Sequence, residues 1–495
     1  MIQRVRSAET LLRISLWAAL VAVVSFTRAD PDLWGHVRFG EDILRDLSLP
    51  DRDPYSFTSD RPWVNHEWLA EVAAGGCWRV AGPAGLVVLK LGIVCGLLLL
   101  VCRMLRDEGI HVPRIRDYLA GIAVITTIQQ AHHVRPQIFS LLFFGVLLTC
   151  LIEAGRGHTR WLLPIPILFA TWANFHGGWI VGGAVLLLWT VGVAMKGPLQ
   201  AAVAYAVTGA ASLIATLANP YGVGMWQFLR ETVGFGRADI ADWQPIYSLD
   251  PSVWLLWIVA AALAAVGCLR AARTRVDPIR VLVVIVLAVA SFRVNRLLAF
   301  FAIATVFLLG RAIAEATGDR SRTQRSQGRT ARVAATALAL TMIVLAVAFT
   351  AVNLTRIRID PRFTPGPGAV GFLKTRLGGR LLVWFDWGEY AIWQLAPAFK
   401  VSIDGRRETA YSADLQDRHL RFFFDAAGEE RLADEISADY VWIPRHLPAG
   451  PRLGASGWTP VYTDEQSVIF ARGEGNRQPV TQPVPSSSPR WFPGP

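Results

Sequence analysis

Val333-Ala-Ala-Thr-Ala-Leu-Ala-Leu-Thr-Met-Ile-Val-Leu-Ala-Val-Ala-Phe-Thr-Ala-Val352 is a long apolar run without a single charged side chain. A helix of this length, about 20 residues, crosses the hydrocarbon core of a bilayer. Similar runs occur at 11–28, 84–105 and 177–195. Because apolar residues make up 53% of the chain and charged residues only 18%, the sequence predicts a polytopic membrane protein and excludes a water-soluble one.

We expect a mainly α-helical bundle of about eleven spans, followed by a small soluble α/β domain. The spans are placed near 11–28, 84–105, 117–131, 136–154, 160–174, 177–195, 200–218, 252–270, 279–292, 296–315 and 332–353. The third, fifth and ninth are short, which is typical of tilted, re-entrant or shielded segments. The first run resembles a signal peptide but lacks a small-x-small cleavage pattern, so we expect an uncleaved first span.

The basic residues alternate between the two sides of the predicted bundle. With the N-terminus inside, the inner segments hold about 20 Arg and Lys, roughly twice the number in the outer loops. This predicts a multi-pass protein of the bacterial cytoplasmic (inner) membrane whose C-terminal part, from about Arg356, lies outside. The net charge of +11 is not gathered in one segment, so no nucleic-acid partner is expected.

Three regions follow from this pattern. Residues 1–355 form the transmembrane domain, with a long first outer loop at 29–83, and residues 356–474 form the α/β domain. The Pro- and Ser-rich tail, 475–495, is expected to be disordered. Within the α/β domain, strands are predicted at 381–385, 400–403, 440–443 and 468–471, and helices at 389–395, 415–424 and 429–436.

The first outer loop carries an unusual set of polar residues. It opens with Asp30-Pro-Asp32-Leu-Trp-Gly-His36 and ends with Trp63-Val-Asn65-His66-Glu67-Trp68. Between them, Val37, Phe39, Ile43, Leu44 and Leu47 give the apolar face of an amphipathic helix expected to lie along the membrane interface.

Other polar clusters fall at the outer ends of later spans. They are His132-His133-Val-Arg135-Pro136, Asn174-Phe-His176-Gly177 and Arg293-Val-Asn295-Arg296. Ionisable groups cost several kcal/mol when exposed to hydrocarbon, so we expect these side chains to face a shared, water-accessible cavity.

Carboxylates, imidazoles and guanidinium groups gathered at an outer membrane surface suit the transfer of a group from a lipid phosphate. A positioned carboxylate takes the proton of an acceptor hydroxyl or amide, and Arg side chains bind the departing phosphate. The predicted catalytic residues are Asp32, which is the candidate base, Asp30, His36 and Glu67. The predicted phosphate-binding residues are Arg135, His132, His133, Arg293 and Arg296. The predicted substrate-binding residues are His66, His176, Asn174, Asp404 and Arg406.

This organisation resembles the GT-C superfamily of polytopic glycosyltransferases, particularly the protein mannosyltransferase and aminoarabinose transferase group. The residues that carry the resemblance are Asp30-Pro-Asp32, the Gly40 to Arg45 helix, the Pro50 to Ser56 turn, Asn65-His-Glu-Trp-Leu, Trp387-Gly-Glu-Tyr and Asp404-Gly-Arg. The resemblance implies a polyprenyl-phosphate-sugar donor, a glycan, lipid or protein acceptor, and catalysis by the loop acid Asp32 or Asp30. The family often has adjacent Asp-Glu and a basic-Pro-Pro-Leu sequence, whereas here a proline separates the two acids and Asn65-His66-Glu67-Trp68 replaces the second motif.

Several alternatives remain open at this stage. Asp30 and Asp32 also suit helix capping, and Arg135 also suits contact with lipid headgroups. A lipid-linked glycan ligase or polymerase would use the same donors; a transporter or flippase, or a scaffold without activity, would need no base. The sequence contains no phosphate-binding glycine loop or Cys/His metal cluster, so no cofactor is expected, although a divalent cation on Asp30, Asp32 or Glu67 is an alternative.

Overall fold

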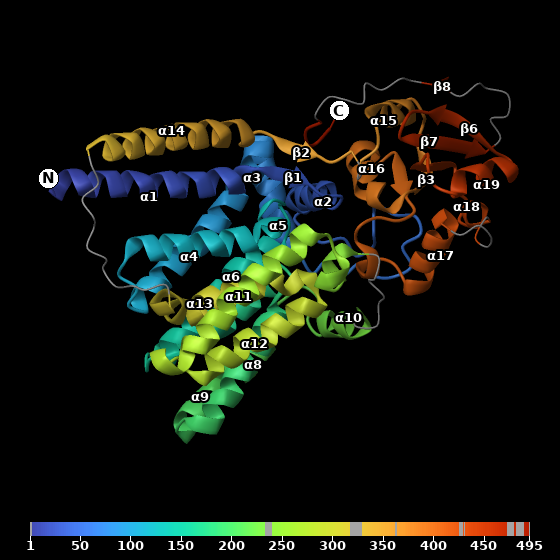
Figure 1. Ribbon diagram of the computed structural model, residues 1–495. Coiled ribbons are helices and arrows are strands. Elements are labelled where there is room, and N and C mark those ends of the chain that lie inside the picture. Colours follow the sequence, from blue (N-terminus) through green and yellow to red (C-terminus); the bar gives the residue numbers. More distant parts are fainter. Residues whose placement is uncertain are drawn as a thin grey trace. The chain divides into compact units, whose positions relative to one another are not determined.

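The computed structural model describes residues 2–232, 240–316, 329–361, 364–424, 429, 431–472, 480–481 and 490–494. Its residues divide into two compact units (Figure 1). The helical unit comprises Met1–Thr27, Leu86–Val223 and Gly236–Thr355, and the mixed unit comprises Arg28–Gly85, Gly224–Phe235 and Arg356–Pro495. Each unit is described by itself.

The helical unit is built from apolar helices. They are α1 (Ile2–Ser25), the second part of α3 (Trp68–Asp107), α4 (Pro113–Thr126), α5 (Ile128–Ala131), α6 (Gln137–Gly155), α7 (Pro164–Trp172), α8 (Trp179–Lys196), α9 (Leu199–Ala215), α11 (Pro251–Thr274), α12 (Pro278–Arg293), α13 (Leu298–Ala316) and α14 (Arg329–Asn353). Helix α13 is almost fully buried and packs against α4, α6, α11 and α12, while α1 and α14 lie side by side.

Six segments are long and apolar enough to cross a membrane among the residues that the structure describes. They are Trp68–Asp107, Gln137–Gly155, Trp179–Lys196, Pro251–Thr274, Asn295–Ala316 and Val333–Asn353. Large apolar side chains on the last of these, such as Val344 and Leu345, are exposed, as suits a surface that faces lipid. The chain is therefore a mainly α-helical, multi-pass membrane protein, as predicted.

The predicted count of eleven spans is not settled by these helices. The five other expected positions are also helical, and correspond to α1, α4, α7, α9 and α12. Helix α7 has only nine residues, too few to cross the hydrocarbon core alone. Helix α3 contains a break at Ala81 and Gly82, where Gly82 has φ +56 and Pro83 follows. The predicted span at 84–105 corresponds to the part after this break.

The mixed unit contains a six-stranded sheet in the order β4-β3-β5-β7-β6-β8, and β1 pairs with β2. The strands are β1 (Thr27–Ala29), β2 (Ile357–Ile359), β3 (Gly379–Val383), β4 (Phe399–Val401), β5 (Tyr440–Pro444), β6 (Trp458–Thr463), β7 (Ser467–Arg472) and β8 (Val480–Thr481). Strand β3 is parallel to β4 and β5, with Leu381 opposite Val401 and Tyr440, and β7 is antiparallel to β5 and β6.

Short helices complete the mixed unit. They are α2 (Leu33–Asp46), α10 (Gly224–Thr232), α15 (Pro367–Lys374), α16 (Gly388–Leu395), α17 (Ala413–Phe424), α18 (Leu432–Glu435) and α19 (Ala449–Ala455). A core that includes Leu382, Phe423, Val441 and Trp458 joins the sheet to these helices. The strands and helices predicted for 356–474 overlap β3, β4, β5, β7, α16, α17 and α18, and residue 430 of the predicted helix 429–436 lies outside the described residues.

The first outer loop belongs to the mixed unit and not, as the predicted boundaries had it, to the transmembrane part. Backbone bonds join Phe57 N to Val401 O (3.1 Å) and Val401 N to Tyr55 O (3.0 Å), so the loop extends the sheet beside β4. Helix α2 packs against α16, and Val37 and Phe39 are buried inside the unit. These two side chains of the predicted interfacial face are therefore used for internal packing.

The predicted disordered tail, 475–495, lies largely outside the described residues. The structure describes 480–481 as β8, and 490–494, where Phe492 is buried against Trp34 with ring centroids 5.2 Å apart.

Candidate functional site

Asp32 precedes helix α2, and its carboxylate does not cap that helix. The first turn is capped from another part of the chain, because Gly35 N donates a 3.0 Å hydrogen bond to Glu389 Oε2 of α16. A carboxylate at a helix N-terminus is favourable, since the unpaired N–H groups there carry partial positive charge. The capping alternative for Asp32 is therefore not supported. The half-buried Asp32 carboxylate is in a position to make other contacts.

Two glycines allow the two acids to come close. A Cβ atom at Gly405 would overlap both Asp32 Oδ1 and Glu389 Oε1, and a Cβ atom at Gly35 would overlap Glu389 Oε2. The Asp32 and Glu389 carboxyl groups thus face the same point above Gly405. Gly405 is therefore a position where the backbone approaches the candidate base closely.

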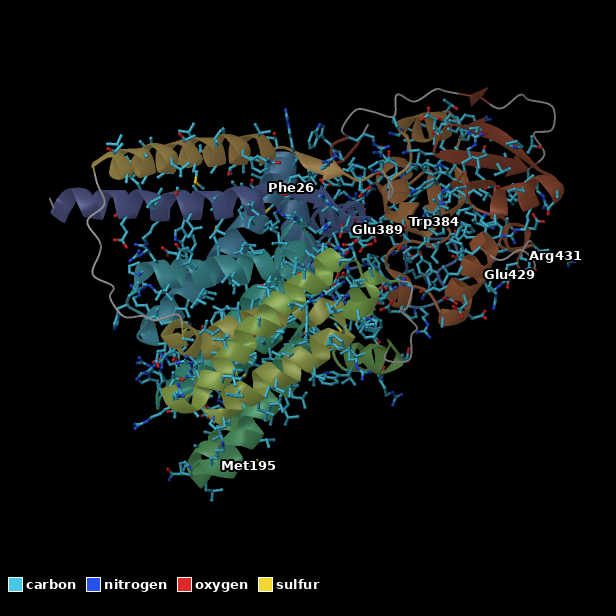
Figure 2. All side chains as sticks on the ribbon, viewed as in Figure 1. Phe26, Met195, Trp384, Glu389, Glu429 and Arg431 are labelled. Carbon is cyan, nitrogen blue, oxygen red and sulfur yellow. The ribbon has the colours of Figure 1, made fainter. Side chains whose placement is uncertain are left out.

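Glu389 is buried, with 3% of its surface exposed, and lies on α16 (Figure 2). Its burial raises its pKa well above the ordinary 4.5, and the nearby carboxylates Asp32 and Asp404 raise the pKa further, against an opposing effect of Arg406. Glu389 therefore favours its protonated form beside the more accessible Asp32.

His36 lies one turn after Asp32 and faces a second buried acid. Its Nδ1 is 3.4 Å from Glu71 Oε1, and Asn65 Nδ2 donates to Glu71 Oε2 at 2.5 Å. Burial acts to lower the pKa of His36, but the contact with Glu71 and the charges of Glu67, Glu71 and Asp32 outweigh it and raise the pKa above 6.5. This part of the mixed unit therefore combines a candidate base with an imidazole that readily becomes a cation.

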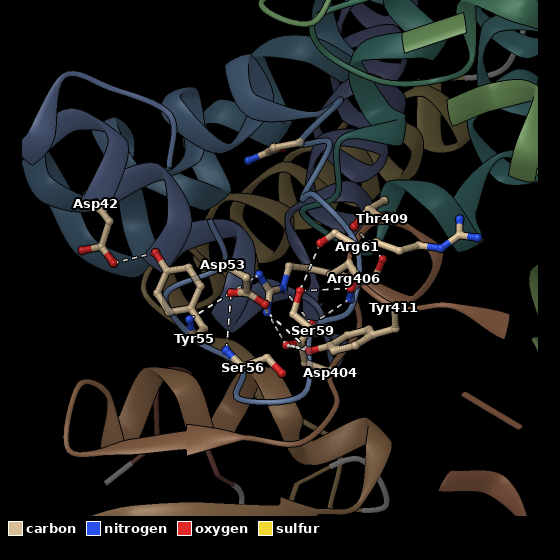
Figure 3. A network of polar contacts seen from close by, with 12 residues as sticks. Asp42, Asp53, Tyr55, Ser56, Ser59, Arg61, Asp404, Arg406, Thr409 and Tyr411 are labelled. Atoms are coloured by element: carbon tan, nitrogen blue, oxygen red, sulfur yellow. Dashed lines mark hydrogen bonds and ion pairs between the residues drawn. The ribbon is translucent and has the colours of Figure 1, made fainter. Parts of the chain in front are cut away.

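Arg406 is the centre of a buried network (Figure 3). Its guanidinium binds both oxygens of Asp53 (2.7 and 2.8 Å) and both oxygens of Asp404 (2.9 and 2.7 Å). Tyr411 Oη donates to Asp404 Oδ2 at 2.7 Å, and the guanidinium also lies 4.7 Å from the ring centroid of Trp63. With both carboxylates engaged, Asp404 and Arg406 hold the first loop against the C-terminal segment. The structure favours this role over the predicted substrate contact.

The end of the first loop is held in a similar way. His66 packs on Phe228 of α10, with ring centroids 5.5 Å apart, and its Nε2 lies 3.5 Å from Glu67 Oε1. Asp30 is buried, with 5% of its surface exposed. Of the predicted catalytic acids, Asp32 and Glu67 keep more accessible side chains than Asp30.

The helical unit contains a separate cluster of cations around the short 3-10 helix η2 (Ala241–Trp243). Arg135 Nη1 pairs with Asp242 Oδ2 at 3.2 Å, and the Arg296 guanidinium lies 5.5 Å from the ring centroid of Trp243. Arg296 Nη2 also lies 2.7 Å from His176 Nε2. The structure thus brings together three predicted residues that are far apart in the sequence.

His176 has contacts at both ring nitrogens. Its Nδ1 lies 2.7 Å from Ser140 Oγ and 3.0 Å from Gly178 N, and Trp172 Nε1 donates to Ser140 Oγ at 2.7 Å. Because a guanidinium only donates, Arg296 Nη2 donates the 2.7 Å hydrogen bond to His176 Nε2. This holds the Arg296 guanidinium just before the N-terminus of α8, which is an environment that an anion prefers.

The remaining predicted residues of the helical unit are more scattered. Arg293 is exposed in the last turn of α12. His132 is the C-cap residue of α5 and packs edge-on against Phe26, and His133 is the next residue. Asn174 Nδ2 donates to the carbonyls of Ala170 and Ala218, which indicates a structural role.

Sequence reasoning missed three of the central acids. Glu389 and Asp53 were visible only as members of the Trp387-Gly-Glu-Tyr and Pro50 to Ser56 sequences, and Glu71 lies inside an apolar helix. The glycine in each of Leu33-Trp-Gly35 and Asp404-Gly405 was the available signal for a close approach. Among the described residues, no group of three or more His, Cys, Asp or Glu is arranged to hold a metal ion.

Comparison with solved structures reveals the same fold in glycosyltransferases. ArnT from Cupriavidus metallidurans in the apo state matches with a TM-score of 0.54 and 11% identity over 95% of this chain and 97% of that one. The structure of ArnT bound to undecaprenyl phosphate matches with a TM-score of 0.53 and 10% identity, over 97% of this chain and 99% of that one. Arabinofuranosyltransferase AftD from Mycobacteria matches with a TM-score of 0.52 and 13% identity over 94% of this chain and 40% of that one.

No family model matches the sequence, and no curated protein does. The solved structures show a shared fold with ArnT and AftD.

Proposed function

We propose that this protein is a membrane glycosyltransferase that moves a sugar from a polyprenyl-phosphate-linked donor to a hydroxyl or amide acceptor on the outer side of the bacterial cytoplasmic membrane. The observation that carries the proposal is the pair of clusters within the GT-C fold. The mixed unit holds Asp32 with His36, and the helical unit holds Arg296 with His176. One solved structure of the same fold contains undecaprenyl phosphate.

The Asp32 cluster supplies the base. In the transfer step, the acceptor oxygen or nitrogen bonds to the anomeric carbon of the sugar while its proton passes to Asp32. The bond between that carbon and the donor phosphate oxygen breaks in the same step. A positioned carboxylate contributes about 10²–10⁴-fold to such a reaction.

The Arg296 cluster supplies donor-phosphate contacts. The Arg296 guanidinium is held by its hydrogen bond to His176 Nε2, and Arg135 is a second cation beside the same short helix. Guanidinium groups held in this way suit the binding of a lipid phosphate. Arg293, His132 and His133 are proposed as outer members of this set.

A ligase or polymerase that transfers a longer glycan would use the same residues, and acceptor size separates the two functions. A transporter or flippase would leave the donor intact. Purified protein in liposomes is supplied with polyprenyl-phosphate sugars extracted from bacterial membranes and with a bacterial envelope extract as the source of acceptor. It is expected to release polyprenyl monophosphate, measured by mass spectrometry. Donor that crosses the bilayer but stays intact would overturn the transferase proposal in favour of a transporter.

A further inference from the structure

The carboxylate that caps helix α2 belongs to Glu389, which lies 354 positions after Gly35 in the chain. The transfer step proposed above assigns no role to Glu389. We propose, on the basis of the proposed function, that Glu389 is a positioning residue. It carries one proton and directs it toward Asp32, so that Glu389 is a carboxylic acid and Asp32 a carboxylate.

The geometry gives each oxygen of Glu389 a different partner. Oε2 accepts a hydrogen bond from Gly35 N at 3.0 Å, and Oε1 points to the space above Gly405 that Asp32 Oδ1 also faces. A protonated Oε1 is a donor directed toward an acceptor, whereas an ionised one would bring two like charges together. The two carboxyl groups can approach this closely because Gly35 and Gly405 have no side chains.

The surroundings of Glu389 favour the proton. The charged groups that act on it are Asp32, Asp404, Glu71 and Arg406. Arg406 is the only cation of the four, and its guanidinium is already bound by Asp404 and Asp53. Burial and the three carboxylates raise the pKa of Glu389, so Glu389 is the member of the pair that favours the proton.

A hydrogen bond from a neutral acid stabilises the ionised form of its acceptor. Glu389 therefore keeps Asp32 able to take a proton at neutral pH. During transfer, the acceptor proton moves to Asp32 while Glu389 retains its own proton. If Glu389 loses its proton at high pH, the two carboxylates repel each other and the orientation of Asp32 is lost.

Three variants test this role. Glu389→Gln keeps an acceptor for Gly35 N and a donor for Asp32, and is expected to retain activity within about threefold at neutral pH. The wild type is expected to lose activity at high pH, and Glu389→Gln should not show this loss. Glu389→Leu removes the donor, and is expected to lower kcat at least tenfold and move the acid limb of the pH profile upward. Glu465→Gln, at an exposed site of the same unit, is the control and should match the wild type.

Infrared spectroscopy gives a readout that does not depend on transfer. The wild type and Glu465→Gln should show a protonated carboxyl band at neutral pH that is missing in Glu389→Gln. The proposal is overturned if that band is absent from the wild type, or if Glu389→Gln is as inactive as Glu389→Leu. If the wild type transfers no sugar, the proposed function fails, and the infrared band still decides the protonation of Glu389.

Discussion

Arg296 and Arg293 are three residues apart, yet the structure gives them different surroundings. Arg296 faces His176 and Trp243, whereas Arg293 is exposed. The sequence placed both in one phosphate-binding set because the two charges lie in the same short turn. Their difference depends on which spans pack beside α12 and α13, which local sequence does not show.

This difference predicts the effect of removing each charge. Arg296→Gln is expected to weaken the binding of polyprenyl phosphate about tenfold or more, because it removes a charge-assisted hydrogen bond. Arg293→Gln removes the charge of an exposed, outer member of the set, and should change the affinity less than threefold. Titration of the two purified variants with polyprenyl phosphate measures both values. Equal losses would show that the His176 cluster is not the phosphate site.

The buried Glu389 predicts a dependence of stability on pH. Its pKa in the folded protein lies above the ordinary 4.5, so the folded state binds more protons than the unfolded state between these two values. The stability associated with this proton is fully present below about pH 4.5 and is lost as the pH rises through the folded-state pKa. Thermal unfolding in detergent should therefore show Glu389→Gln becoming progressively more stable relative to the wild type as the pH is raised above about 5. A difference that stays constant over this range would contradict the assignment.

At the scale of elements, strands with continuous apolar runs were predictable, and interrupted ones were not. Strand β3 contains Leu381, Leu382 and Val383, all fully buried, which is the pattern of a strand covered on both faces. Strand β6 contains Pro460 and a bulge between Pro460 and Tyr462, so its sequence does not read as a strand. Helix α2 was predicted correctly as a helix, but local amphipathicity does not distinguish lipid from α16 as the partner of its apolar face.

The contact between α2 and the turn before α17 predicts a sensitive glycine. Gly405→Ala would place a methyl group against Asp32 and Glu389, and is expected to reduce transfer about 100-fold, because small displacements of reacting groups are costly. Gly454→Ala in α19 is the control, since nothing lies within 4 Å of the added atom. Donor turnover by both variants, at equal amounts of folded protein, measures the effect. Full activity of Gly405→Ala would show that the two acids do not need this approach.

At the scale of the whole molecule, composition was sufficient to predict a polytopic membrane protein, but not its division into units. The first loop joins the C-terminal segment through contacts such as that between Asp53 and Arg406, which are 353 residues apart. A single sequence contains no signal for pairs so distant. The division therefore depends on the structure, whereas the helical, membrane-spanning character follows from the sequence.

The charge asymmetry of the sequence predicts the orientation of the chain in the membrane. In a chain whose five native cysteines are replaced by serine, Asp51→Cys in the first loop should react with an impermeant thiol reagent added to intact cells. Arg160→Cys, also exposed, is expected on the inner side and should react only after the membrane is opened. Labelling of Arg160→Cys alone in intact cells would show that the chain has the opposite orientation. It would contradict the proposed outer location of the reaction.

The most direct test of the proposed mechanism compares donor turnover by Asp32→Asn with donor turnover by Asp46→Asn. Asp46 is the control, because it is exposed at the end of helix α2. Both proteins are reconstituted in liposomes with polyprenyl-phosphate sugars and a bacterial envelope extract as the source of acceptor, and the released polyprenyl monophosphate is quantified by mass spectrometry. Asp32→Asn is expected to insert and fold normally and to lose about 10²–10⁴-fold in rate, because it has no carboxylate to take the acceptor proton. Asp46→Asn should match the wild type. Release by Asp32→Asn at the wild-type rate would contradict the assignment of Asp32 as the base.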